Sequence, residues 1–418
     1  MKKIENFIYG MIKKNKKIKN FVRNIYQLIH APIGFTKGSK FGKLKLVRKY
    51  DNSFFGFHDR ASLNSSGSLI SHYQYKMNPD GIGTSMIKVK SIYNDNVLFE
   101  VKTNCCNYQQ GSLATWMDDE HIIFNDFLTV PVARIINIHT SSESRLPFHF
   151  YSISDNLEFV TSISFARYGQ GLIGYGYNVS YSDDYIEDAK CNKGKTELSD
   201  FVVYNRFHDK EVVRISIYQA IQLSEGLIDK GYYYFSHSNF SPDSSKVYFL
   251  LRSSNENYNS SQLFVYDITL SKLFALPTSG MVSHLSWLDS NTIVAYCNTK
   301  ENTSDGYYVF DSKHEWETSC RVAPEVKVDG HPHAISATKF ITDTYPDKYR
   351  HQHLSVISTD NRSIVDLASI YSPLKFKDNV RVDLHPRLSK CKRYLTIDSS
   401  FEGKRSQLVI DFDKELIL

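Results

Sequence analysis

Hydrophobic positions in the C-terminal half of the chain follow a repeated pattern. Four segments carry a histidine near their start, cross a short polar turn and continue into a stretch of alternating apolar and polar residues: HSNFSPDSSKVYFLLR, SHLSWLDSNTIVAYCN, GHPHAISATKFITDTY and LHPRLSKCKRYLTIDS. Their leading histidines, His237, His284, His331 and His385, are separated by 47, 47 and 54 residues. A second alternating stretch follows each segment, such as QLFVYDI or GYYVFDS. Units of several short strands that repeat about every 40–50 residues predict the blades of a β-propeller.

Weaker copies of the unit in the N-terminal half bring the predicted number of blades to seven. FHDRASLNSSGSLISHYQY, GSLATWMDDEHIIFNDF and YSISDNLEFVTSISF have the same turn-then-strand pattern. The predicted blades cover residues 51–104, 105–150, 151–236, 237–282, 283–329, 330–383 and 384–418. Residues 169–200 are too long for a hairpin and are expected to be an insertion over one face of the propeller.

The last predicted blade lacks a fourth strand, and the first predicted strand lacks a partner. The last blade has room for only three strands, whereas residues 44–50 (LKLVRKY) form a strand without a partner. Pairing the two would remove an open sheet edge, which is a site for unwanted association. We therefore expect the N-terminal strand to complete the last blade of an all-β, seven-bladed propeller.

The first 30 residues predict a basic amphipathic helix. Apolar residues recur there at helical spacing, among eight lysines and arginines and a single acidic residue, Glu5. The segment is not a secretory signal, and no run reaches the roughly 18 apolar residues of a membrane span. Such a helix can lie on an anionic membrane surface, or it can dock on the main domain with its lysines in solvent. Residues 31–42, which contain Pro32 and three glycines, predict a linker, so the expected division is 1–42 and then a propeller over 43–418.

Composition agrees with a β-rich protein and narrows its partners. Aromatic residues make up 14% of the chain, with 28 Tyr and 26 Phe, and aromatic residues favour strands. The six cysteines form no CxxC pair, which predicts reduced thiols and a cytoplasmic protein, with peripheral contact to the inner face of the membrane as the alternative. The net charge is +5. The first 30 residues have a net charge of +7, so residues 31–418 have a net charge of −2. A propeller with this charge is not predicted to bind nucleic acid.

Several motifs resemble a known family. SHSNFSPDSSKVYFL and HPRLSKCKRYLTIDSSFEGKRSQLVIDF resemble blades of the oligogalacturonate lyases, seven-bladed propellers that cleave uronate-containing oligosaccharides. FFGFHDRASLN, YQQGSLATW, DGHPH…TDTYPD and DLHPR…DSSFEGKR are more similar to propeller proteins associated with bacterial surface-polysaccharide (O-antigen or capsule) synthesis. The resemblance spans most of residues 50–418. It implies a carbohydrate-active protein whose partner is an acidic oligo- or polysaccharide.

The lyase resemblance implies β-elimination. A base, often histidine, removes the proton at C5 of a uronic acid, and the 4-linked sugar leaves. In that family, histidines and a glutamine hold a divalent metal, usually manganese, against the substrate carboxylate. His385 and Pro386 match the last-blade motif, but Val382 and Arg387 stand where the family has the glutamine and a second histidine. The substitution leaves both a metal site with other ligands and a metal-independent site open.

The resemblance also implies roles for particular residues. His284 or His237 would be the base, and Arg252 and Arg387 would neutralise the uronate carboxylate. Tyr345 is a candidate general acid, although Pro346 and the acidic neighbours in TDTYPD favour a turn that ends a strand.

His331, His333 and His385 form the predicted metal or substrate cluster, with Mn²⁺ as the expected ion. His331 and His333 are grouped because alternate residues of a strand share a face. Further predicted substrate contacts are His333 itself, Arg387, Asp59 of the FHDR motif and Arg405. For the leading histidines, the alternative is a structural one, in which each bonds to neighbouring strands or turns.

Two other functions remain open on the same fold. A non-catalytic propeller could bind glycans or scaffold a membrane-associated synthesis complex. A glycoside hydrolase or glycosyl-transfer enzyme would use paired carboxylates. The sequence offers four candidates for such a pair: Asp59, Asp126, Asp343 and Asp398.

Overall fold

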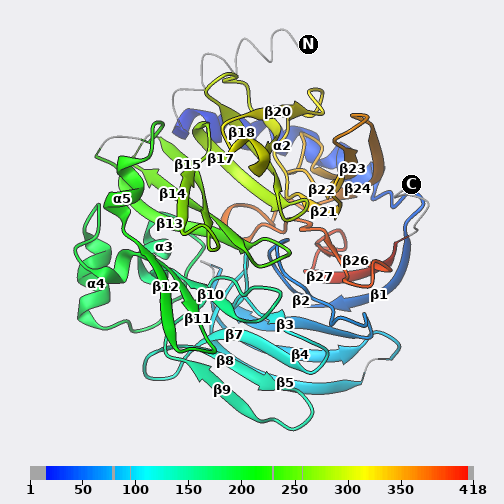
Figure 1. The fold of residues 1–418 in the computed structure, drawn as a ribbon. Helices are drawn as coiled ribbons and strands as arrows, with labels where there is room; N and C mark the ends of the chain where they lie inside the picture. The colour runs from blue at the N-terminus through cyan, green and yellow to red at the C-terminus, as the bar shows by residue number, and fades with distance from the viewer. Residues whose placement is uncertain (1–15, 78–80, 95, 228–229, 257, 413–418) are drawn as a thin grey trace.

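The chain folds into seven antiparallel sheets arranged around a central axis (Figure 1). This computed structural model describes residues 16–77, 81–94, 96–227, 230–256 and 258–412. The predicted seven-bladed β-propeller is therefore confirmed.

The first three blades contain strands β2 to β12. Blade 1 comprises β2 (Ser53–Phe54), β3 (Leu69–Met77), β4 (Ile82–Ser91) and β5 (Val97–Asn107). Blade 2 comprises β6 (Thr115–Trp116), β7 (His121–Phe127), β8 (Pro131–Asn137) and β9 (Glu143–Leu146). Blade 3 has three strands, β10 (Phe159–Ser162), β11 (Phe201–Asn205) and β12 (Lys210–Ile215).

The remaining four blades follow in chain order. Blade 4 comprises β13 (Tyr232–Phe240), β14 (Lys246–Ser254), β15 (Asn259–Asp267) and β16 (Lys272–Ala275). Blade 5 comprises β17 (Thr278–Trp287), β18 (Thr292–Thr299), β19 (Gly306–Asp311) and β20 (Ser319–Val322). Blade 6 comprises β21 (His333–Ser336), β22 (Lys339–Thr342), β23 (His351–Ser358) and β24 (Ile364–Tyr371). Blade 7 comprises β25 (Arg387–Leu388), β26 (Tyr394–Ser399), β27 (Ser406–Asp411) and β1 (Lys45–Asp51).

The ring is closed by the two ends of the chain. β1 pairs antiparallel with β27, from Lys45 opposite Asp411 to Asp51 opposite Ser406, and Figure 1 shows blue β1 beside red β27. The expected closure of the last blade is confirmed. It satisfies the backbone groups of β27 that would otherwise form an open edge.

Apolar faces of neighbouring blades pack together and hold the ring rigid. Between blades 3 and 4, Phe201 stacks on Phe249 with ring centroids 4.1 Å apart, and Phe249 stacks in turn on Phe264. All three side chains are fully buried. Because the strands are paired within each blade and the apolar faces of neighbouring blades are packed together, residues at the inner ends of the strands are held at fixed positions around the axis.

The chain between β10 and β11 forms α3 (Phe165–Gly171), α4 (Asp183–Lys190) and the 3₁₀ turn η1 (Glu197–Ser199). The predicted insertion falls in this segment. Ser164 caps the start of α3 through the backbone N–H of Arg167. The buried Arg167 side chain donates hydrogen bonds to the carbonyl oxygens of Tyr233, Asp188 and Asn192, and it thereby fastens both helices to blade 4.

Helix α2 (Lys16–Lys37) extends further than the sequence predicted. It runs through Pro32 to Lys37, so the prediction of a linker for residues 31–37 is wrong. Tertiary packing explains the extension: Ala31 is buried, and a β-carbon at Gly34 would lie 1.7 Å from the carbonyl oxygen of Tyr349 in blade 6. The first half of the predicted helix, residues 1–15, lies outside the described residues. Among the residues that the structure describes, no helix is long and apolar enough to cross a membrane.

Candidate active site

Histidines from five blades meet on the axis of the propeller. Their rings surround Phe57, with ring centroids 4.6–6.0 Å from the phenyl ring: those of His58, His237, His284, His331 and His385. The four leading histidines of the repeats are therefore brought together, as the repeat pattern predicted. His58 joins them from the FHDR motif of blade 1.

Local irregularities in the backbone turn these side chains toward the axis. His237 and His284 lie within β13 and β17, at register shifts between Ser236 and Asn239 and between Val282 and Leu285. Both strands start five residues before their blades were predicted to begin, because the bulges let a strand continue past its histidine. His237 and His385 also have positive φ angles, of 52° and 46°. Such angles are uncommon for residues other than glycine and often mark functional sites.

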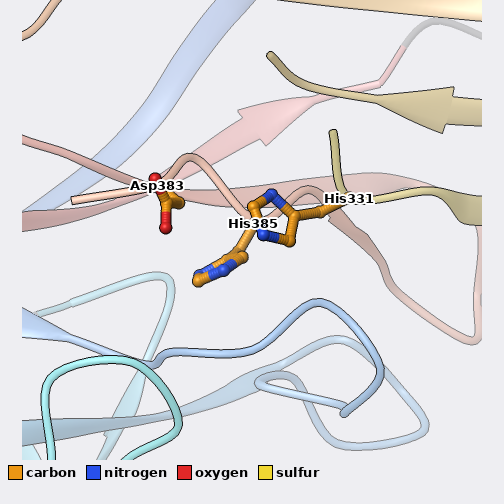
Figure 2. Close-up of side chains that lie close together, drawn as sticks. All are labelled: His331, Asp383 and His385. Carbon is orange, nitrogen blue, oxygen red and sulfur yellow. The ribbon is translucent and has the colours of Figure 1, made fainter. Parts of the chain in front are cut away.

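His331, Asp383 and His385 form a candidate metal centre (Figure 2). Their ligand atoms all lie within 4.8 Å of one another, and Figure 2 shows the side chains converging from the segments that precede β21 and β25. Each residue has a buried atom with no hydrogen-bond partner among the described residues: Nε2 of His331, Nε2 of His385 and Oδ1 of Asp383. Unpaired buried polar atoms are costly, so three of them in one cluster of metal-ligating residues indicate a missing ligand.

The carboxylate of Asp343 orients both histidines. It accepts hydrogen bonds from Nδ1 and the backbone N–H of His331, both at 2.8 Å, and from the backbone N–H of His385 at 3.0 Å. The bond to Nδ1 leaves the lone pair of Nε2 facing the cluster. A carboxylate behind a histidine in this way is the usual support of a metal ligand.

The carboxylates around His331 favour positive charge at this residue of the cluster. Burial disfavours the charged form of His331, but Asp343 and then Asp383 and Asp329 raise its pKa above the ordinary value. The pKa of Asp343 is lowered: burial opposes this, and His331 outweighs it. The same carboxylates that hold a proton on His331 would attract a divalent cation in its place.

His284 has the surroundings of a general base. Its Nδ1 lies 3.2 Å from Oδ1 of Asp329 and 3.1 Å from Oγ of Ser283, and its ring centroid is 4.1 Å from that of His331. Burial and then the charge of His331 lower the pKa of His284, although Asp329 opposes them. His284 is therefore neutral at neutral pH, while Asp329 can stabilise the imidazolium formed on proton transfer.

His237 and Arg252 lie on the blade 4 side of the cluster. Burial, Arg252 and the neighbouring histidines hold the pKa of His237 well below its ordinary value, and Nδ1 of His237 has no partner among the described residues. Arg252 is half-buried and donates to Oγ of Ser236 and to the carbonyl oxygen of Ser283, each at 3.1 Å. Its fixed charge disfavours a protonated His237, which makes His284 the better base.

Tyr345 lies at the cluster, in the loop between β22 and β23. Its ring centroid is 5.7 Å from that of His331 and 6.3 Å from that of His284. Burial raises its pKa well above the ordinary value, so the hydroxyl keeps its proton. The guanidinium of Arg381 lies 5.9 Å from the ring centroid, and its Nε donates to Oδ2 of Asp383 at 2.7 Å. Arg381 therefore fixes the carboxylate whose other oxygen faces the two histidines.

His333 is not part of the cluster, contrary to the prediction. β21 begins only at His333, so His331 lies before the strand and the rule that alternate residues share a face does not apply to the pair. Nδ1 of His333 donates to the carbonyl oxygen of His58 at 2.8 Å. The side chain lines a separate pocket of about 330 Å³ with Asp59, at the C-terminal ends of the innermost strands. Asp59 lines this pocket and burial raises its pKa, but none of the three cluster residues lines it, and the contact of Asp59 with substrate stays a prediction.

Arg387 and Arg405 have structural roles, which corrects their predicted contacts with substrate. Arg387 is buried and donates to Oδ1 of Asp398 at 3.0 Å, to Oγ1 of Thr396 and to the carbonyl oxygen of Gly56. Its donors are used in joining blade 7 to blade 1.

Arg405 is also buried. Its guanidinium stacks 3.8 Å from the ring centroid of Tyr108 and donates to the carbonyl oxygens of Val380 and Arg381. Both arginines look like substrate-binding residues in the sequence, because nothing in the sequence shows which backbone carbonyls surround them.

Several residues of the site were not predicted from the sequence. Asp383 stands two residues before His385 in DLHPR, and this D-x-H spacing is the one signal that could have revealed it. Asp343 was considered only as a possible acid of a hydrolase. The roles of Asp329, Arg381 and Phe57 carry no signal in the sequence, because their partners come from other blades.

Comparisons with known proteins agree with this architecture. No family model and no curated protein matches the sequence. An oligogalacturonate lyase solved in complex with manganese has a TM-score of 0.56 at 10% identity, over 91% of this chain and 97% of that chain. An oligogalacturonate lyase from Vibrio parahaemolyticus has a TM-score of 0.57 at 10% identity, over 90% and 97%.

A third similar structure is a domain of a protease. The β-propeller domain of the Trilobed protease from Pyrococcus furiosus has a TM-score of 0.52 at 10% identity, over 90% of this chain and 95% of that chain. The likeness shows the fold alone. The function must be argued from the site, since propellers with different activities share this architecture.

Proposed function

We propose that this protein is a metal-dependent lyase that cleaves a uronate-containing oligo- or polysaccharide by β-elimination. The observation that carries the proposal is the convergence of three unpaired, buried ligand atoms, from His331, Asp383 and His385, beside a carboxylate-supported histidine. The fold shared with a lyase that was solved with manganese supports the same proposal.

His331, Asp383 and His385 would hold the cation. Two imidazoles and a carboxylate suit Mn²⁺, Fe²⁺ or Zn²⁺, and Mn²⁺ is our choice by analogy with the similar lyase. When bound, the ion would neutralise the substrate carboxylate and so make the C5 proton more acidic. Arg252 would add a second positive charge on the blade 4 side, in the role first assigned to both Arg252 and Arg387.

The chain's own residues supply the proton transfers. Neutral His284 accepts the C5 proton, and Asp329 stabilises the resulting imidazolium. The electron pair of the C5–H bond forms the C4=C5 double bond, and the C4–O bond to the next sugar breaks. Tyr345, which stays protonated, donates its proton to the departing oxygen. The ring centroids of His284 and Tyr345 are 6.3 Å apart, and they lie 4.1 Å and 5.7 Å from that of His331.

The test combines metal binding with product chemistry. Purified protein is assayed for bound metal by elemental analysis and for Mn²⁺ affinity by titration, and then incubated with a panel of uronate-containing polysaccharides. Only elimination creates an unsaturated uronate that absorbs in the ultraviolet. His331→Ala and Asp383→Asn should lose both the metal and the absorbance. His333→Ala is the matched control, because this histidine is two residues from His331 but lines the pocket of about 330 Å³, which none of the cluster residues lines.

The alternatives predict different results. New reducing ends without ultraviolet absorbance would show hydrolysis. Glycan binding without cleavage would favour a binding or scaffold protein. Full metal content in His331→Ala and Asp383→Asn would refute the proposed ligand set.

A further inference from the structure

The outward face of α2 is apolar. Ile25, Leu28, Ile29 and Ile33 follow the i, i+3, i+4, i+8 spacing of one helical face, and their exposed fractions lie between 43% and 64%. Phe35, at the edge of this face, is 69% exposed. An ordinary surface helix turns such a stripe toward the core and its polar residues toward water.

The opposite face of the same helix is the one that docks on blade 6. Gln27 accepts a hydrogen bond from Arg350 at 3.3 Å, and the ring of His30 packs edge-on against Tyr349 at 5.7 Å. Ala31 is buried and Gly34 touches the backbone of Tyr349. Because this contact holds the helix, the stripe of Ile25, Leu28, Ile29 and Ile33 faces away from the propeller.

The sequence of the N-terminal segment is strongly basic. The first 50 residues contain fourteen lysines and arginines and one acidic residue, whereas residues 51–418 contain 36 basic and 44 acidic residues. Residues 1–50 therefore have a net charge of +13 and residues 51–418 a net charge of −8. An anionic surface attracts the N-terminal segment and repels the rest of the protein. The charge also argues against a second copy of this chain as the partner, since two such segments would repel each other.

We propose that α2 docks this protein on an anionic lipid bilayer. The helix would lie in the plane of the interface, with Ile25, Leu28, Ile29 and Ile33 at the boundary with the acyl chains and the basic segment among the headgroups. This inference goes beyond the proposed function and does not depend on it.

The docked helix and the candidate active site lie at the same end of the propeller. Asp343 follows β22, which runs antiparallel to β21, and so lies at the end where β21 begins. The loop from Asp343 to Arg350 carries Tyr345 to the cluster and Tyr349 to α2. Binding through α2 would therefore bring the end of the propeller that holds the cluster close to the lipid surface.

The test is co-sedimentation of the full-length protein with vesicles. Phosphatidylcholine vesicles are compared with phosphatidylcholine–phosphatidylserine vesicles, at low and high salt. Leu28→Ser is compared with Leu270→Ser, a matched control on the turn between β15 and β16, because the two leucines are 62% and 65% exposed. Both substitutions are at exposed positions and should leave the fold intact.

We expect salt-sensitive binding to the phosphatidylserine vesicles alone, weakened on the order of tenfold by Leu28→Ser and unchanged by Leu270→Ser. Absence of binding to anionic vesicles, or equal binding of the two variants, would overturn the proposal. A dimer in solution that Leu28→Ser dissociates would overturn it in favour of a second copy as the occupant of this face.

Discussion

Replacing Asp343 by asparagine tests the link between fold and site. The side chain is fully buried, and its two oxygens accept three hydrogen bonds that join the segment before β21 to the segment before β25. Asparagine has nearly the same size but only one acceptor oxygen, and its NH₂ group must face an N–H donor. At least one of the three bonds is therefore lost, together with the negative charge beside His331.

The expected magnitudes follow from these contacts. A hydrogen bond to a charged group contributes about 1.5–3 kcal/mol, so Asp343→Asn should lower the free energy of unfolding by about 2–3 kcal/mol. The substitution also frees the imidazole of His331 to adopt the wrong tautomer or orientation. Loss of such a supporting partner weakens metal binding about 10- to 100-fold.

The assay is Mn²⁺ titration followed by urea unfolding of the same samples without metal. Asp366→Asn is the control: this carboxylate lies on β24 of the same blade, is exposed and accepts a bond from Ser355. It should change neither quantity. If Asp343→Asn kept wild-type affinity for Mn²⁺ while folding normally, the carboxylate would not orient the ligands, and the reasoning about the cluster would be wrong.

Three further predictions concern a buried arginine between two blades, the candidate general acid and a buried histidine away from the cluster. Arg387→Met should destabilise the protein by about 3–5 kcal/mol in urea unfolding, because Asp398 is left buried without its partner, yet Mn²⁺ affinity should not change. Tyr345→Phe should slow formation of the unsaturated product about 100-fold or more at unchanged metal content. Burial holds the pKa of His149 at about 4, so the unfolded state binds the extra proton first and stability falls as the pH drops from about 6.5 toward 4. By pH 4.5 the loss should be about 2–3 kcal/mol, and His149→Gln should abolish this part of the pH dependence measured by urea unfolding.

The fold could be predicted because the evidence for it is periodic. A histidine, a polar turn and an alternating strand recur at nearly constant spacing, so several weak signals point to the same architecture. The closure by β1 followed from the count of strands in the last blade. The end of α2 could not be predicted in this way, because Pro32 and Gly34 look like linker residues until Gly34 meets Tyr349.

The candidate site was predictable only where the repeats mark it. The convergence of His237, His284, His331 and His385 follows from their equivalent positions in neighbouring blades. Asp383 takes the place assigned to His333. β21 begins only at His333, so His331 and His333 do not share a face of the strand.

The amino-acid sequence by itself determined the propeller, its seven blades, the ring of histidines and the strongly basic N-terminal segment. Each of these depends on local patterning or on a repeat, which neighbouring residues specify together. Only the tertiary structure decided which polar side chains keep an unpaired atom at the axis. It also decided which of them form hydrogen bonds that join the blades. Arg387 and Arg252 are alike as residues, but one is buried against a carboxylate and the other is half-exposed beside His284. The physical reason is that hydrogen-bond partners and burial are supplied by segments far apart in the chain, and only the closed ring brings them together.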